Sequence, residues 1–504
     1  MSMTELLPLA VLCSSLLPGL VIFALPESWH ATRTMLNLFG AIAKLGLVFL
    51  LLAGVHAGES FGVRFEVLPG LDLAFKADAL GLLFITLSAI LWLLTTLYAI
   101  GYLEDAPHRS RFFGFFSLCV TATMGIAMAA NLFTFFVFYE LLTLSTFPLV
   151  VHRGTDKAMK GGTVYLAYTL LGGTALLAGI AWLQHLLGHT EFAHGGTAAL
   201  IGAEYAGQLR IIFLLLISGV GVKAALVPLH GWLPQAMVAP APVSALLHAV
   251  AVVKAGAFGI VRIVYEVYGV EFAQSLNLLL PLAIVASVTI VWGSFRALFQ
   301  DDLKKRLAFS TVSQVSYIAL GVALFGPIGT IGGVVHLVHQ GIMKITLFFC
   351  AGNYAETLGI HKVSEMDGAG RRMPFTTLAF SIGALGMMGA PLTAGAVSKA
   401  WLMDGATAAG MNWAIWVLWT SSLLNAAYFL PILWRAWFRP APMAWPEEHI
   451  SKNGWRETAW LLLLPPLFTA LATLAAAVFA DAAISPLAWA RLIAAREYIG
   501  LETP

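Results

Sequence analysis

Residues 221–230 read Gly-Val-Lys-Ala-Ala-Leu-Val-Pro-Leu-His, so a lysine and a proline interrupt a run that is otherwise apolar enough to cross a membrane. A proline inside a helix removes a hydrogen bond and kinks or breaks the helix. Irregular backbone at membrane depth persists only where protein or a wet cavity surrounds it. Because Lys223 precedes Pro228 here, the stretch predicts a broken transmembrane helix inside a larger membrane protein.

The composition extends this prediction to the whole chain. Of the 504 residues, 59% are hydrophobic and only 11% are charged, whereas a soluble protein carries roughly twice that charged share. We expect an all-α polytopic membrane protein with about fourteen transmembrane helices. The net charge of +2 gives no sign of a nucleic-acid partner. The expected spans are 5–25, 35–55, 77–100, 111–129, 131–151, 163–186, 208–228, 240–267, 275–297, 307–325, 328–352, 374–402, 411–435 and 459–481.

Basic residues are shared unevenly between the connections. Cytoplasmic connections of membrane proteins are enriched in Lys and Arg, which places the odd-numbered connections in the cytoplasm and both termini outside. Glu5 precedes the first apolar run and no basic region comes before it, so we expect a retained helix rather than a signal peptide. The odd-numbered connections hold Arg33, Arg109, Arg111, Arg153, Lys157, Lys160, Lys304, Lys305, Arg306, Lys362, Arg371, Arg372, Arg435, Arg439, Lys452 and Arg456, and the even-numbered ones hold Arg64, Lys76, Arg210 and Arg262.

A second run repeats the lysine-and-proline pattern. Residues 389–399 include Pro391 and end at Lys399. Broken helices at corresponding places in two halves are typical of inverted-repeat transporters. We therefore expect one membrane domain, with N-terminal helices in 1–109, repeats in 110–267 and 275–435, and a C-terminal helix and tail in 436–504.

Charged residues inside the apolar runs are the candidate functional residues, because an intramembrane charge is costly and marks an ion path. Glu140 lies deep in an apolar run, although a helix-end carboxylate is the alternative. Lys223 has no acidic residue near it in sequence, so we expect Glu140 to be its partner from another helix; a snorkelling lysine is the alternative. Lys399 is the expected counterpart of Lys223 in the second half.

Two histidine–lysine segments complete the set. His248 and Lys254 are six residues apart, a spacing that does not place them close together on one helix face, so at least one of them is expected to serve packing. Lys254 is the stronger candidate, since a buried histidine is as often a packing residue as a functional one. His336, Gln340 and Lys344 are spaced to form one helical stripe, a plausible proton relay with water. His336 and His339 could chelate zinc, but no third ligand is evident, so no metal is expected.

The remaining polar features predict structure rather than chemistry. Asp78 opens the third span and is expected to cap its helix. No nucleotide, haem or iron–sulfur motif is present, so we expect no cofactor and no enzymatic activity of the chain by itself.

Two segments resemble the antiporter-like membrane subunits. The first is Lys223-Ala-Ala-Leu-Val-Pro-Leu-His-Gly-Trp-Leu-Pro234, followed by Ala-Pro242-Val-Ser-Ala-Leu-Leu-His248. The second is Asp302-Leu-Lys-Lys-Arg-Leu-Ala-Phe-Ser-Thr-Val-Ser-Gln314. That family comprises the three large proton-pumping subunits of respiratory complex I, the A-type and D-type components of Mrp-type sodium/proton antiporters, and membrane subunits of energy-converting hydrogenases. The resemblance covers roughly residues 75–430.

The resemblance implies fourteen core helices, two inverted five-helix repeats and broken helices seven and twelve. It implies proton-path roles for matching residues. Glu140, Lys223, Lys254, His336, Lys344 and Lys399 match such positions, and His248 matches a histidine more typical of the A-type Mrp component. His339 is one residue away from a histidine that the family often has, where this chain has Gln340.

The function implied is a proton-translocating subunit of an Mrp-type cation/proton antiporter or a related complex, in a bacterial-type inner membrane. Other membrane subunits, the lipid bilayer, protons and Na⁺ are the expected partners. The chain lacks the additional C-terminal spans of the family member with a long lateral helix, which favours a protein like the D-type Mrp component, or a stand-alone member. Two alternatives remain: the membrane subunit of a two-part inorganic-carbon (CO₂/bicarbonate) uptake complex, and the pump module of a complex I-like or hydrogenase complex.

Overall fold

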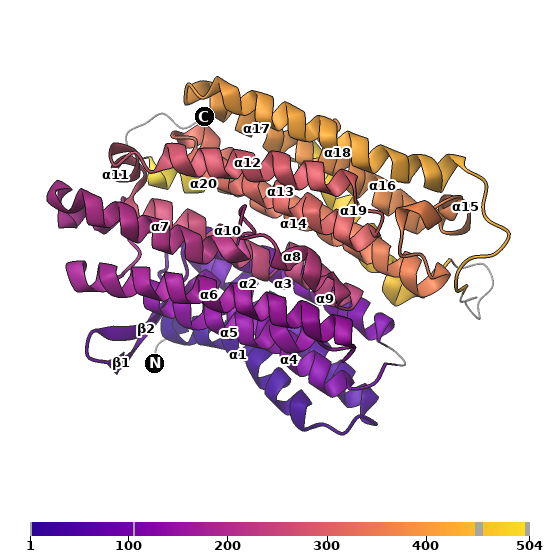
Figure 1. Cartoon of the computed structure of the whole chain (residues 1–504). Helices are drawn as coiled ribbons and strands as arrows, with labels where there is room; N and C mark the ends of the chain where they lie inside the picture. Colours follow the sequence, from indigo (N-terminus) through magenta and orange to yellow (C-terminus); the bar gives the residue numbers. More distant parts are fainter. Residues whose placement is uncertain (1–2, 104–105, 449–456, 499–504) are drawn as a thin grey trace.

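The computed structural model describes residues 3–103, 106–448 and 457–498, and these residues are mostly helical. Their long helices run across Figure 1 and pack side by side as one bundle. The first half holds α1 Met3–Ala24, α2 His30–His56, α3 Ala79–Tyr102, α4 Arg109–Met128, α5 Leu132–Val150, α6 Asp156–Leu187, α7 Ala206–Lys223, α8 Trp232–Gln235, α9 Ala241–Ala249 and α10 Val252–Arg262. The second half holds α11 Val270–Ser275, α12 Leu279–Leu298, α13 Leu303–Ala323, α14 Pro327–Leu358, α15 Ala369–Arg372, α16 Pro374–Met388, α17 Ala394–Ala408, α18 Asn412–Phe438, α19 Trp460–Val478 and α20 Pro486–Glu497.

Twelve helical segments of the described chain are long and apolar enough to cross a membrane, which makes this a multi-pass membrane protein. Two of the expected spans are not among them. The expected span 307–325 corresponds to α13, a buried helix with a polar composition. The expected span 374–402 is divided between α16 and α17, each shorter than a bilayer-crossing helix. The count of fourteen and the inverted repeats therefore stay predictions.

Each proline break lies between two helices. α7 ends at Lys223, and Pro228 lies before α8. α16 ends at Met388, and Pro391 lies before α17. A non-glycine residue adopts the left-handed conformation in each break, Ala225 with φ +57° and Leu392 with φ +63°. Such strained residues persist where the surrounding structure holds them, and they cluster at functional sites.

A third interruption was not expected. The span 240–267 divides into α9 and α10, and Val250 and Ala251 between them leave helical geometry. His248 therefore lies on one short helix and Lys254 on the next. The expectation that these two residues cannot share a helix face holds only for a continuous helix, so it does not apply here.

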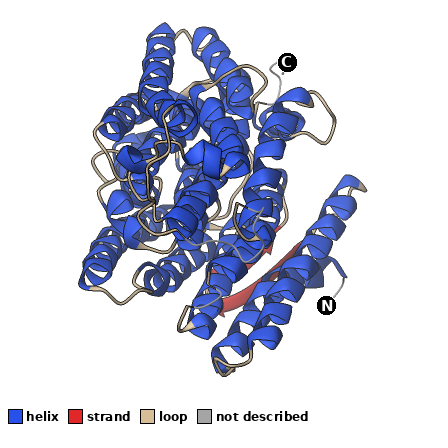
Figure 2. Ribbon diagram, turned by 90° about the vertical axis from the view of Figure 1, so that its right-hand side faces the viewer, coloured by secondary structure: helices blue, strands red, loops and turns tan. Residues whose placement is uncertain are grey.

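A β-hairpin interrupts the otherwise helical fold. β1 Gly62–Leu68 pairs antiparallel with β2 Leu71–Lys76, and Gly70 turns the chain with φ +78°. A positive φ costs glycine little, which suits this position. Seen roughly along the helices in Figure 2, the two strands lie at the side of the bundle marked by the N-terminus. The all-α class describes the bundle, and the hairpin is an addition that the sequence did not predict.

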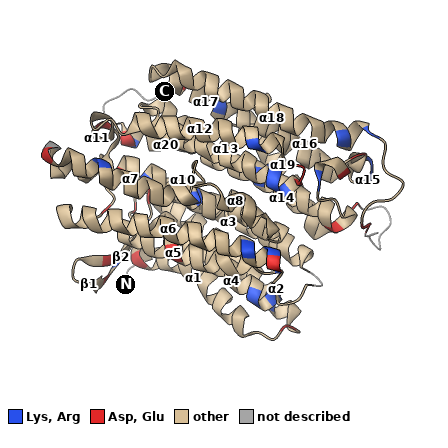
Figure 3. Ribbon diagram, in the orientation of Figure 1, with Lys and Arg blue, Asp and Glu red and all other residues tan. Residues whose placement is uncertain are grey.

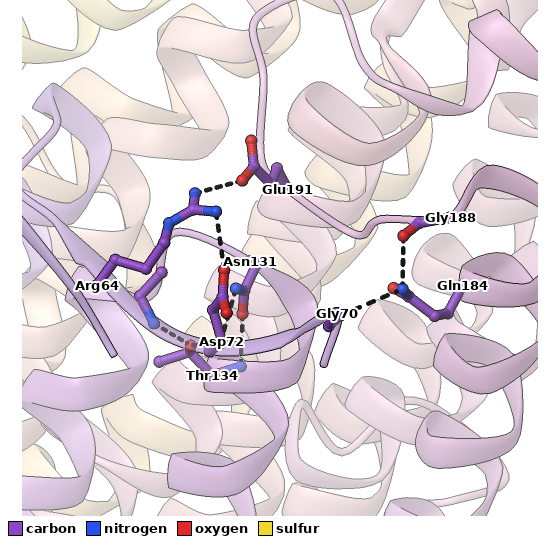
Figure 4. A network of polar contacts seen from close by, with 9 residues as sticks. Arg64, Gly70, Asp72, Asn131, Thr134, Gln184, Gly188 and Glu191 are labelled. Atoms are coloured by element: carbon purple, nitrogen blue, oxygen red, sulfur yellow. Dashed lines mark hydrogen bonds and ion pairs between the residues drawn. The ribbon is translucent and has the colours of Figure 1, made fainter. Parts of the chain in front are cut away.

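The hairpin is bound to the start of α5 and to the connection after α6 (Figure 4). Arg64 donates to Asp72 at 2.9 Å and also pairs with Glu191. Asn131 donates to the Asp72 carbonyl at 3.0 Å, and Thr134 Oγ1 accepts from the backbone N–H of Ala74 at 2.8 Å. These bonds fix the end of the helix that carries Glu140.

The two ends of the bundle differ in charge. In Figure 1 the hairpin and both marked chain ends lie at the left side of the bundle, which we call the hairpin end. Lys and Arg gather mainly at the opposite end, around α15 and the nearby ends of α4, α6 and α18 (Figure 3). Among the described residues, most Lys and Arg thus lie at one end of the molecule. Lys452 and Arg456, which the sequence also assigns to an odd-numbered connection, lie outside the described residues.

Candidate functional site

Glu140 and Lys223 lie near each other but form no ion pair. Lys223 is fully buried at the end of α7, and its Nζ donates to the carbonyl of Tyr139 and lies 3.4 Å from the centre of the Tyr139 ring. Glu140 is partly buried, and its Oε1 has no hydrogen-bond partner among the described residues. Its carboxylate lies against Gly173 of α6, where a Cβ would be 2.2 Å from Oε1. Gly173 therefore provides the space for this carboxylate.

His248 and Lys254 are fully buried and unpaired. Neither ring nitrogen of His248 has a partner in the described chain, and the ring stacks on Phe348 with centroids 4.4 Å apart. Lys254 Nζ likewise has no hydrogen-bond partner there. The backbone of α10 packs directly against the break after α7, because a Cβ on Gly256 would lie 2.1 Å from the backbone nitrogen of Ala224.

The centre of the molecule is α14, on which His336, His339, Gln340 and Lys344 are all fully buried. His336 Nδ1 hydrogen-bonds Ser398 at 2.8 Å, whereas its Nε2 has no partner. The side chains of His339 and Gln340 have none among the described residues. Lys344 donates to Ser310 at 2.6 Å and lies within electrostatic range of Lys254.

Lys399 binds the end of the half-helix before it. Its Nζ donates to the carbonyls of Met387 and Met388 at 2.9 and 3.0 Å, and to Ser422 at 2.9 Å. The last carbonyls of a helix have no partner within the helix and carry partial negative charge. The break between α16 and α17 exposes these carbonyls at the place where Lys399 can use them.

A polar chain connects Lys344 with Lys399. Ser310, which accepts from Lys344, is also hydrogen-bonded to the Tyr428 hydroxyl at 2.7 Å. The Tyr428 hydroxyl binds Asn425 Oδ1, and Asn425 Nδ2 donates to the Met387 carbonyl at 3.0 Å. That carbonyl also accepts from Lys399. An amide and a carbonyl do not pass protons on, so this chain orients the two lysines, and a moving proton needs water beside it.

Tyr317 lies between His336 and Lys399. Its ring stacks on the His336 ring with centroids 5.0 Å apart, and Lys399 Nζ is 5.6 Å from the Tyr317 ring centre. Its buried hydroxyl faces Ser421 and Ser422 but forms no hydrogen bond at normal distance. Neither Tyr317 nor the chain through Tyr428 stood out in the sequence, because tyrosine and serine are common in membrane helices.

Lys44 is a fully buried lysine that the prediction from sequence missed. It lies on α2, donates to Ser15 at 2.7 Å and sits 4.7 Å from the centre of the Trp92 ring. Ser15 in turn shares a 2.8 Å hydrogen bond with Thr121. A lone lysine in an apolar run is the signal that identified Lys223, and it applied equally to Lys44.

Several buried polar atoms of the site have no hydrogen-bond partner among the described residues. A buried polar atom without a partner is costly, and ordered water is the partner that proteins use at such sites. A row of this kind is suited to moving protons between side chains and water. Within the described residues, no group of three His, Cys, Asp or Glu side chains could hold a metal ion, and the His336–His339 pair gains no third ligand. Among the buried atoms that have no hydrogen-bond partner in the described residues are atoms of Glu140, His248, Lys254, Gln314, Tyr317, His336, His339 and Gln340.

Family models match most of this region. The model described as "NADH:quinone oxidoreductase/Mrp antiporter, TM" matches residues 129–425, more than half of the chain. The model described as "NADH-Ubiquinone oxidoreductase (complex I), chain 5 N-terminus" matches residues 70–113. The first match contains Glu140, both proline breaks and the buried lysines from Lys223 to Lys399.

Similar proteins include NADH-quinone oxidoreductase subunit N of Desulforudis audaxviator, 32% identical over 82% of this chain and 83% of that protein. A probable K⁺/H⁺ antiporter component of the A/B type from Rhizobium meliloti is 31% identical over 71% of this chain, which spans only 36% of that protein. A chain of the Mrp complex from Dietzia sp. superimposes with a TM-score of 0.82 and 25% identity, covering 99% of this chain and 98% of that one. A chain of Thermus thermophilus respiratory complex I has the same fold, with a TM-score of 0.80, 23% identity and coverage of 97% and 100%. With the family model matched over the breaks and the buried lysines, the chain belongs to the NADH:quinone oxidoreductase/Mrp antiporter family of membrane subunits.

Proposed function

We propose that this chain translocates protons across the membrane as a subunit of an Mrp-type cation/proton antiporter or a related complex. The proton moves along Glu140, Lys223, Lys254, His336, Lys344 and Lys399, with His248 beside the row. Water bridges neighbouring members, and the breaks at Pro228 and Pro391 admit water to the row.

The observation that carries this proposal is the state of the buried lysines. Lys223, Lys254, Lys344 and Lys399 are almost wholly inaccessible, and none of them forms an ion pair with a carboxylate in the described chain. An ammonium group without a counter-ion is costly in an apolar interior. Some of these amines are therefore neutral at any moment and can accept a proton. A proton bound at one lysine repels charge on the next, which drives transfer along the row.

The arrangement in the membrane belongs to the same proposal. The end with most Lys and Arg faces the cytoplasm by the positive-inside rule, so the hairpin end and both termini face outward. Repeats at 110–267 and 275–435 place one break in each half. Other membrane subunits of the complex contact the chain in a bacterial-type inner membrane, and Na⁺ is the candidate exchanged ion.

The test is proton transport by the complex in proteoliposomes. Glu140→Ala is expected to abolish coupled transport while the protein still inserts and assembles, because it removes the only carboxylate of the row. Lys157→Ala is the matched control, since Lys157 is exposed and lies outside the row. Wild-type proton flux in Glu140→Ala would refute the proposed path.

A second candidate function has one specific observation in its favour. The Desulforudis relative, matched over 83% of its length, is named as part of an NADH-quinone oxidoreductase. In that case the same row works as a pump module and redox chemistry elsewhere drives it. Proton transport by the purified complex that responds to a redox substrate, and not to a cation gradient, would select this candidate. The inorganic-carbon alternative stays a prediction from sequence.

A further inference from the structure

A buried charge cluster lies at the hairpin end, outside the row. Arg262, at the end of α10, donates to both carboxylate oxygens of Asp78 at 2.7 and 2.9 Å. Arg262 also pairs with Glu266, which lies on the π-helical turn Ile263–Tyr268. The Arg262 and Glu266 side chains are only 1% and 6% exposed. From the sequence, Arg262 was assigned to a connection and Asp78 only to a helix cap, a role that Asp78 also fills by accepting from Gly81 N–H.

A second layer covers this cluster on the side of the connection after α6. His194 Nδ1 is 3.2 Å from Glu497 Oε1, and the side chains are 49% and 6% exposed. The N–H of Ala193, next to His194, donates to the Glu266 carbonyl at 3.2 Å. The hydrogen bond to Glu497 raises the pKa of His194. The positive charge of Lys76 acts in the opposite direction and lowers it. His194 therefore contacts water on one side and a buried carboxylate, Glu497, on the other.

The charges of this cluster do not balance. Asp78 and Glu266 share one permanent cation, Arg262, and a third carboxylate, Glu497, pairs with His194 and lies within electrostatic range of Glu266. His194 adds a positive charge only when it is protonated. Carboxylates in excess of their cations in an apolar region favour binding a proton over remaining ionised. Asp78 accepts two hydrogen bonds from Arg262 and one from the Gly81 N–H, whereas Glu266 accepts one from Arg262. Hydrogen bonds to a carboxylate favour its ionised form, so Glu266 and Glu497 are the groups better able to hold the exchangeable proton.

The cluster adjoins the row through α10. Lys254 and Arg262 are eight residues apart on this fully buried helix, which places them on one face about 12 Å apart. The helix widens into a π-turn just after Arg262, and such turns are frequent at functional sites. No carboxylate of the cluster lies on the row itself.

We propose that His194, Glu497 and Glu266 form a proton-exchange port between the row and the water at the hairpin end. A proton from water binds Nε2 of the half-exposed His194, and the Nδ1 proton then passes to the Glu497 carboxylate, which leaves a neutral imidazole protonated at Nε2. A flip of the ring then turns that N–H toward Glu497 and leaves an unprotonated nitrogen facing the water. Glu497 passes its proton through water to Glu266, which lies within electrostatic range of it, and becomes a carboxylate again. Arg262 is a positioning residue that keeps its charge throughout. The port rests on the proposed function, because it needs a row to supply.

The test measures proton flux through the complete complex in proteoliposomes while the pH is changed on one side of the membrane at a time. Glu497→Gln is the main variant, because α20 keeps its other attachment, the 3.2 Å hydrogen bond between Tyr498 and Thr330. It is expected to slow proton flux by roughly a hundredfold, the lower end of the scale on which a positioned proton-transfer group acts, and to abolish the response to pH at the hairpin end only. Glu271→Gln, an exposed carboxylate at the same end, is expected to behave as wild type.

A second measurement does not depend on transport. Dicyclohexylcarbodiimide reacts with protonated carboxyl groups in apolar surroundings, so mass spectrometry should find Glu266 or Glu497 labelled, and more strongly at lower pH. Absence of label on both, or wild-type flux and pH response in Glu497→Gln, would overturn the port. If Lys254→Ala also transports normally, the row itself fails; if Lys254→Ala is inactive and Glu497→Gln is normal, only the port fails.

Discussion

The buried lysines Lys223, Lys344 and Lys399 form their hydrogen bonds with uncharged acceptors. Lys223 and Lys399 donate to backbone carbonyls, and Lys344 donates to a serine hydroxyl, where ion pairs with carboxylates would be stronger. A lysine held by a carboxylate must break that pair to lose its proton, at a large cost in a low-dielectric site. A lysine held by neutral acceptors can change its protonation state while its neighbours stay in place. The partners therefore suit repeated proton transfer better than they suit maximal stability.

At this scale we predict that Tyr317→Phe reduces coupled proton transport by roughly a hundredfold. Phenylalanine keeps the ring stacked on His336 and removes only the hydroxyl near Ser421 and Ser422. The measurement is proton flux in proteoliposomes together with thermal stability of the complex. A Tyr317→Phe protein with unchanged stability and wild-type flux would leave Tyr317 with a packing role.

The sequence revealed charged residues far better than hydroxyl-bearing ones. Glu140 and Lys344 stood out because a charge in an apolar run is rare and costly. Ser310 and Tyr428 did not, because they are ordinary in such runs and become informative only once Lys344 and Asn425 are seen on either side of them. Contacts between helices distant in sequence are what a single sequence does not contain.

Broken helices are the element that organises the site. The breaks at Pro228 and Pro391 were predictable because proline cannot continue a helix. The interruption at Val250 and Ala251 was not, because neither residue marks a break and tertiary packing alone imposes it. The hairpin was likewise missed, since its strands are short and lie between two long apolar runs.

At the element scale, we predict that Lys399→Met abolishes transport and Lys399→Arg retains little of it. Lys399 binds the last carbonyls of α16 through one nitrogen. Arginine could keep those hydrogen bonds but does not give up its proton. Flux of both variants should be compared at equal amounts of assembled complex. Wild-type flux in Lys399→Arg would show that Lys399 only caps the half-helix.

The whole molecule has a clear polarity along the helices. The hairpin, the hairpin-end cluster and both chain ends lie at one end, and most basic residues lie at the other. Composition and the resemblance were sufficient to predict the family and the bundle. The layout at each end depends on tertiary contacts such as Arg64 with Glu191, which span more than a hundred residues.

This polarity predicts which residues are reachable from outside the cell. Gln274→Cys, at the hairpin end, should react with a membrane-impermeant maleimide on intact cells, and Lys157→Cys should react only after the cells are opened. Both positions are exposed in the structure, and the native Cys119 and Cys350 are buried. The reverse labelling pattern would invert the proposed orientation.

The polar character of α13 has a consequence for biosynthesis. A nascent helix enters the bilayer from the insertion machinery according to its own apolarity, and α13 does not qualify by that measure. It begins with Lys304, Lys305 and Arg306 and is buried by its neighbours α12 and α14. We therefore expect α13 to enter the membrane together with α14 rather than by itself. A ribosome that stalls between the two would release a chain whose central helix has no place in lipid.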